Sequence, residues 1–231
     1  MKTRKVLTEP EAQYFLLQII DAISYLHSQC VIHRDLKLTN IFLDDNLEVK
    51  VGDLGLAAQL SEPNERKKTM CGTPSYIAPE ILASAEKRAY SYEVDIWSIG
   101  VIAYNLLVGK NPYDGGDVNR TYDNIRENHL EFPLDSNLIS HSARLFIRAL
   151  LTTDPSLRPT LDQMIKHPFF TDSPTPPPQS LPLYILKSPY LLTSRPVSTP
   201  TPVIQRVART SSEEESRFVR GKDGRMICRN G

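Results

Sequence analysis

Residues 31–55 read VIHRDLKLTNIFLDDNLEVKVGDLG. Two short runs of strand-type residues, at 41–43 and 47–51, lie on either side of the Asp-Asp-Asn tripeptide at 44–46. Aspartate and asparagine favour tight turns, and the alternating apolar residues of the two runs are typical of β-strands. The stretch therefore predicts a β-hairpin.

The hairpin would bring two polar side chains together. Asn40 stands just before the first strand and Asp53 just after the second, so we expect them at the same end of the hairpin. Amide and carboxylate oxygens are ligands that Mg²⁺ takes when substrate phosphates also hold it. Asp35 is placed to accept or orient a hydroxyl proton, and Lys37 can neutralise charge on a moving phosphoryl group. The stretch predicts a site for phosphoryl transfer.

The rest of the first 170 residues reads mainly as helix. Thr8 is a capping residue, Glu11 follows three residues later and Pro10 falls in the first turn, which together predict a helix start. Apolar residues then recur at helical spacing up to about His27. Three more helices are predicted at 96–107, 142–153 and 161–167. The expected fold class is α+β, mainly helical, with a short hairpin at the cleft.

Composition changes near residue 171. Residues 1–170 have ordinary globular character, whereas nine of the 18 prolines lie between Pro174 and Pro202. A segment of this kind cannot bury enough apolar surface to form a core. We expect a folded domain at 1–170 and a disordered tail, rich in proline, serine and threonine, at 171–231.

Charge and hydropathy exclude some kinds of partner. Lysine plus arginine and aspartate plus glutamate both number 27, so no bulk charge favours nucleic acid or an anionic membrane. The apolar run at 96–109 is too short to cross a bilayer, and acidic residues interrupt the N-terminus where a signal peptide would be apolar. We expect an intracellular protein of the cytoplasm or nucleus that binds neither nucleic acid nor membrane.

The ordered motifs resemble those of protein kinases. HRDLKLTN at 33–40, DLG at 53–55 and APE at 78–80 are similar to the kinase signature set, in the expected order. GTPSYIAPE at 72–80, together with Lys37, resembles the serine/threonine class. The segments LTEPEAQYFLLQI, ERKKTMCGTPSYIAPEIL and LLVGKNPY are similar in sequence to those of the polo-like kinases.

This resemblance implies transfer of the ATP γ-phosphoryl group to protein serine or threonine hydroxyls, with Mg²⁺. Asp35 would be the catalytic base, Lys37 would contact the γ-phosphate, and Thr73 would bridge these two residues. Asn40 and Asp53 would hold magnesium. The resemblance also implies that Asp95 fixes the backbone of the catalytic loop (residues 33–40) and that Arg158 pairs with Glu80. It further implies a cell-cycle role and, by family analogy alone, a centrosomal location.

One position has a regulatory interpretation. Thr69 follows Arg66, Lys67 and Lys68 and matches the phosphorylation site of the activation segment, here residues 53–80. A phosphate on Thr69 would pair with Arg34 and order the segment. This reading predicts an upstream activating kinase as a partner; the alternative is a solvated basic loop.

The resemblance covers only part of a kinase. Residues 1–30 contain no glycine, so we expect the glycine-rich loop, the strand lysine and the rest of the small lobe to be absent. Without half of the phosphate-binding groups, the chain is expected to be weak or inactive as an enzyme. The alternative is a non-catalytic scaffold that docks substrates.

Overall fold

The computed structural model describes residues 6–62, 64–84, 86–133 and 139–172, and the backbone of 218–220 and 226–228. Its α-helices are α1 Glu9–Ser28, α2 Glu93–Val108, α3 Val118–Glu127, α4 His141–Leu150, α5 Leu161–Met164 and α6 Pro168–Thr171. Its strands are β1 Val31–Ile32, β2 Ile41–Leu43, β3 Val49–Val51, β4 Ala58–Gln59, β5 Phe218–Arg220 and β6 Met226–Cys228. The predicted α+β class, mainly helical with a small hairpin, is confirmed.

Helix α1 begins where the sequence predicts. The Thr8 backbone amide and hydroxyl both donate to the Glu11 carboxylate at 2.8 Å. The first of these bonds satisfies a backbone N–H that has no acceptor within the helix. Pro10 lies in the first turn, where its missing N–H costs no helical bond. The apolar face is buried through the middle of the helix, at Phe15, Leu16, Ile19, Ile20 and Ile23.

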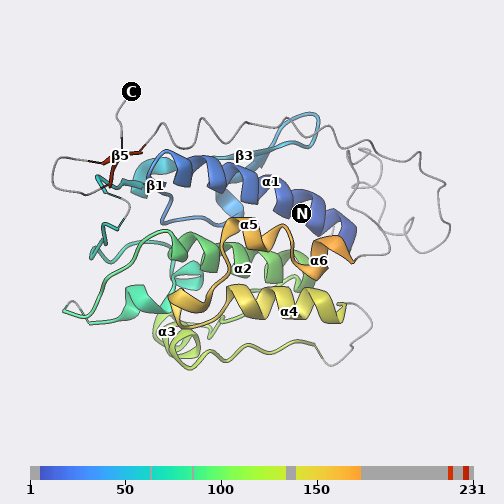
Figure 1. Ribbon diagram of the computed structural model, residues 1–231. Helices are drawn as coiled ribbons and strands as arrows, with labels where there is room; N and C mark the ends of the chain where they lie inside the picture. The colour runs from blue at the N-terminus through green and yellow to red at the C-terminus, as the bar shows by residue number, and fades with distance from the viewer. Residues whose placement is uncertain are drawn as a thin grey trace.

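Helix α2 forms the centre of the domain. Nearly all of its residues are buried, and it lies between α1 and α4 (Figure 1). Gly100 allows α4 to approach closely, because a Cβ at this position would lie 2.8 Å from the Leu150 Cβ atom. The helix ends at Val108 and is followed by Gly109, whose φ of 80° suits a residue without a side chain. The helix predicted at 96–107 is therefore confirmed, and it begins three residues earlier, at Glu93.

The predicted hairpin is formed by β2 and β3, which pair antiparallel with Ile41 opposite Val51. Its second strand begins at Val49, two residues later than the sequence predicts. The reason is the loop: the Leu47 amide donates to the Asp44 carbonyl, and Leu47 has a left-handed φ of 65°. A residue in that conformation cannot continue an extended strand.

Strands β1 and β4 and helix α3 are among the elements that were not predicted. Strands β1 and β4 pair antiparallel, with Val31 opposite Gln59, and so connect the residues just before the catalytic loop to the activation segment. Each has two residues, too few to show an alternating pattern. Helix α3 has few apolar residues, but Asp117 caps it by accepting a hydrogen bond from the Arg120 amide at 3.0 Å.

Most of the predicted tail, 171–231, lies outside the described residues. Within it the structure describes the end of α6 and the antiparallel pairing of β5 with β6. The proposed boundary at residue 170 stays a prediction. In the described part of the chain, no helix combines the length and apolar character needed to span a membrane.

Candidate active site

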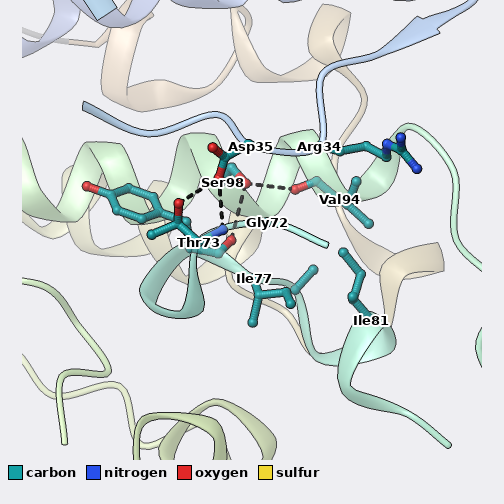
Figure 2. Close-up of a pocket in the computed structure, with 10 residues that line it drawn as sticks. Arg34, Asp35, Gly72, Thr73, Ile77, Ile81, Val94 and Ser98 are labelled. Atoms are coloured by element: carbon teal, nitrogen blue, oxygen red, sulfur yellow. Dashed lines mark hydrogen bonds between the residues drawn. The ribbon is translucent and has the colours of Figure 1, made fainter. Parts of the chain in front are cut away.

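Three residues from two distant segments form a compact polar cluster. The Lys37 ammonium donates to Asp35 Oδ2 at 2.6 Å and to the Thr73 hydroxyl oxygen at 2.8 Å. The Thr73 backbone amide and hydroxyl both donate to Asp35 Oδ1, at 2.8 and 2.6 Å. Figure 2 shows Asp35 and Thr73 turned toward each other. Thr73 therefore contacts both Asp35 and Lys37, the two residues that the kinase resemblance implies it bridges.

The charge on Asp35 follows from these contacts. Burial raises the pKa of the Asp35 carboxyl, but the hydrogen bonds and charge of Lys37 and the hydrogen bonds from Thr73 outweigh it. The net result is a pKa below that of an ordinary aspartate. Asp35 is therefore ionised at neutral pH and able to accept hydrogen bonds.

The backbone before Asp35 is held by a buried carboxylate from α2. Asp95 has no solvent exposure, and its two oxygens accept hydrogen bonds from the backbone amides of His33, at 2.9 Å, and Arg34, at 3.0 Å. His27, at the end of α1, places Nε2 2.8 Å from Asp95 Oδ2. Arg34 has a left-handed φ of 66°, which this anchoring maintains. The expected contact of Asp95 with the catalytic loop is confirmed, whereas His27 was not predicted.

The two predicted metal ligands lie at the same end of the hairpin. The Asn40 side-chain amide donates to the Asp35 carbonyl at 2.9 Å, and the Asn40 carbonyl accepts from the Gly52 amide at 2.9 Å. Asp53 follows Gly52 directly and has a left-handed backbone, with φ 59° and ψ 71°. Its carboxylate accepts a hydrogen bond from the Gly55 amide at 3.3 Å. Asn40 is buried and Asp53 is exposed.

The donor set has the chemistry of a magnesium site that needs its substrate. In the described part of the chain no group of three or more His, Cys, Asp or Glu side chains is arranged to hold a metal ion. One carboxylate and one amide oxygen suit Mg²⁺ when phosphate oxygens and waters supply its other ligands. These residues therefore fit the metal only together with a nucleotide.

Thr69 and Arg34, the predicted regulatory pair, are joined through a third residue. Arg34 points away from Asp35 (Figure 2) and donates to the Leu56 carbonyl at 2.6 Å and the Tyr90 hydroxyl at 3.3 Å. The Tyr90 hydroxyl in turn donates to the Thr69 carbonyl at 2.7 Å. The Thr69 residue itself is exposed. No sequence pattern identifies Tyr90, because its contacts are far away along the chain.

A second ion pair secures the end of the activation segment. The Arg158 guanidinium donates to both Glu80 oxygens at 2.7 Å, and it also donates to the Glu93 carbonyl at 2.8 Å. Only 1% of the Arg158 side chain and 11% of the Glu80 side chain are exposed. The guanidinium carbon lies 5.1 Å from the centre of the Trp97 ring. The expected Glu80–Arg158 contact is confirmed. Because the pair is buried, its role is to hold the fold together.

Comparisons with known proteins agree with this geometry. The family model of the protein kinase domain matches residues 1–170. The chain is 50% identical over 175 residues to the probable serine/threonine-protein kinase PLK of Dictyostelium discoideum and to the serine/threonine-protein kinase PLK1 of Xenopus laevis. It is 51% identical over 170 residues to the cell cycle serine/threonine-protein kinase CDC5/MSD2 of Saccharomyces cerevisiae.

These three alignments cover 76%, 76% and 74% of this chain, but only 17%, 28% and 24% of the relatives. The chain thus spans less than a third of the length of the curated relatives it matches. Within that span about half of the aligned residues are identical to those of serine/threonine kinases of the polo-like group. The chain belongs to the protein kinase domain family.

Proposed function

We propose that the chain carries catalytic groups of a polo-like serine/threonine kinase, which transfers the γ-phosphoryl group of ATP to hydroxyls of protein substrates. The single observation that carries the proposal is the cluster of Asp35, Lys37 and Thr73. It places an ionised carboxylate, a cation and a hydroxyl within hydrogen-bonding distance. Under this proposal the partners of the chain are protein substrates with serine or threonine hydroxyls. The proposal also gives the chain a cell-cycle role and an intracellular location.

Asp35 receives the substrate hydroxyl at Oδ2. Its other oxygen, Oδ1, already accepts two hydrogen bonds from Thr73, whereas Oδ2 accepts one from Lys37. A carboxylate oxygen has room for two such bonds, so Oδ2 has capacity for the hydroxyl. Asp35 orients that hydroxyl and takes its proton as the phosphoryl group moves. Lys37, adjacent to Oδ2, stabilises negative charge on the transferred group.

Asn40 and Asp53 would hold magnesium together with the nucleotide. The metal, when bound with ATP, neutralises charge on the phosphates and aligns them. Asn40 is already fixed by its hydrogen bond to the Asp35 carbonyl, so the base and this metal ligand keep a constant separation. Residues are then positioned before the substrate arrives, which lowers the cost of reaching the transition state.

A second candidate function is a substrate-docking scaffold without catalysis. It is favoured by the absence of glycine from residues 1–30, which therefore supply no glycine-rich loop over the phosphates. The catalytic proposal is favoured because a scaffold has no physical need for Asp35, Lys37, Asn40 and Asp53 together. We propose that the chain by itself binds ATP weakly and turns over slowly.

Thermal unfolding with nucleotide distinguishes the two candidates. We expect Mg·ATP at millimolar concentration to raise the melting temperature by about 1–4 °C, because a ligand of the folded state stabilises it by mass action. Magnesium alone should give no shift, since the protein offers few ligands without phosphate. ATP with a chelator should give less than Mg·ATP. The absence of any shift would favour the scaffold.

We also propose that an upstream kinase with a preference for basic residues phosphorylates Thr69. Thr69 follows three basic residues and is exposed, in a part of the activation segment outside any helix or strand. Incubation with such a kinase should incorporate about one phosphate per chain, and Thr69→Ala should lose it. Incorporation that is unchanged in the variant would place the phosphate elsewhere.

A further inference from the structure

Tyr90 occupies an unusual place between the catalytic loop and the activation segment. Its residue is only 1% exposed, yet its hydroxyl makes hydrogen bonds with two segments. It donates to the Thr69 carbonyl at 2.7 Å and accepts from Arg34 Nη1 at 3.3 Å. The Tyr90 backbone also exchanges two hydrogen bonds with Lys67, at 2.8 and 3.1 Å. Tyr90 therefore holds the activation segment at two points, Lys67 and Thr69.

We propose that the Tyr90 hydroxyl is a positioning group that fixes residues 67–73 of the activation segment against Arg34 in the unphosphorylated chain. Arg34 donates to three neutral oxygens, those of Leu56, Ala57 and Tyr90. Its cation thus reaches the backbone of Thr69 through the tyrosine. The Tyr90 hydroxyl therefore connects Arg34 to Thr69 through neutral hydrogen bonds. A phosphate on Thr69 would connect the same two residues through an ion pair.

The linkage matters because the positioned stretch leads directly to the catalytic cluster. Three residues after Thr69, Gly72 has a φ of 113°, and a Cβ there would lie 2.9 Å from the Arg34 carbonyl oxygen. Thr73 follows and donates twice to Asp35. Loosening the chain at Thr69 should therefore loosen the bond between Thr73 and Asp35. The proposed kinase function gives this geometry its significance, but the geometry itself is testable without catalysis.

The variant Tyr90→Phe tests the hydroxyl while keeping the buried ring. Hydrogen exchange is measured at the amides of Lys67 and Thr73, which the structure bonds to the Tyr90 carbonyl and to Asp35 Oδ1. Loss of the hydroxyl's hydrogen bonds should speed exchange at both amides by about fivefold to tenfold. Unchanged exchange at both amides would overturn the proposal.

Tyr104→Phe is the matched control. Tyr104 is equally buried, and its hydroxyl also donates to a backbone carbonyl, that of Glu131 at 2.6 Å. The control should lower the melting temperature to a similar degree but leave exchange at Lys67 and Thr73 unchanged. If it speeds these two amides as much as Tyr90→Phe does, the effect is general loosening and the proposal fails.

A double-mutant cycle separates positioning from packing. If Tyr90 acts by linking Arg34 to the segment, then Tyr90→Phe should add little to the exchange rate of Thr73 once Arg34→Gln is present. If the tyrosine only fills space, the two effects multiply, which would contradict the proposal. Neither result depends on phosphoryl transfer, so a failure here leaves the proposed function standing, and a failure of that function leaves this test valid.

Discussion

Asp35→Asn is expected to slow phosphoryl transfer by about a thousandfold, within the range that general acid–base groups contribute. The side-chain amide keeps the size of the carboxylate but cannot take a proton, and one of its atoms becomes a donor facing either Lys37 or Thr73. The rate is measured as labelled phosphate incorporated into a protein substrate, at chain concentrations high enough to quantify a slow parent.

Asp45→Asn provides the control, because Asp45 is an exposed residue of the hairpin loop and undergoes the same chemical change. It should retain the parent rate. A rate for Asp35→Asn within a few-fold of the parent would remove the carboxylate from the mechanism.

The pH dependence of stability gives Asp35→Asn a second, independent readout. Because the folded state lowers the pKa of Asp35, the ionised carboxylate favours folding above its unfolded pKa. That contribution is lost as the pH falls through the folded pKa. The melting temperature of the parent should therefore exceed that of the variant at neutral pH, and the difference should shrink in acid. A constant difference across this range would mean that the carboxylate charge is not stabilised by its partners.

Arg158→Ala is expected to lower the free energy of unfolding by about 3–5 kcal/mol, the usual cost of breaking a buried ion pair from one side. The variant leaves the Glu80 carboxylate and the carbonyls of Glu93 and Thr152 without their donor. It also removes the cation beside Trp97. Chemical denaturation measures the loss as a shift in the midpoint at unchanged slope.

Arg66→Ala is the matched comparison for this prediction. Arg66 also bonds both oxygens of a glutamate, Glu93, at 2.9 and 2.8 Å, but 48% of its side chain is exposed. Exposed ion pairs contribute about 0–1 kcal/mol, so this variant should change stability little. Equal losses in the two variants would show that burial does not determine the strength of these pairs.

The sequence predicts the parts of the fold that have local signals. Helix α1 has a cap at Thr8 and a regular apolar face, and the hairpin has turn residues between two strand-type runs. Strands β1 and β4 have no such signal, since each has two residues and its partner lies far along the chain. The late start of β3 was missed because nothing in the letters marks Leu47 as left-handed.

The candidate site also contains some residues that the sequence predicts and others that it does not. The positions of Asp35, Lys37 and Asn40 follow from a short motif, whereas Thr73 was indicated only by the resemblance of GTPSYIAPE at 72–80 to serine/threonine kinases. His27 and Tyr90 were missed because their contacts are formed by folding: His27 meets a carboxylate 68 residues later, and Tyr90 meets Arg34 56 residues earlier. Side chains that act by holding other groups leave no pattern in a single sequence.

The left-handed backbone of Asp53 limits which residues could replace it in a descendant of this protein in which catalysis was no longer selected. Aspartate, asparagine and glycine occupy such a conformation at low cost, whereas most other side chains strain it. Selection for a folded product alone would still admit Asn or Gly at position 53, while selection for magnesium chemistry would keep the acid. A lineage that had lost activity would therefore be recognisable by a narrow set of replacements at this codon.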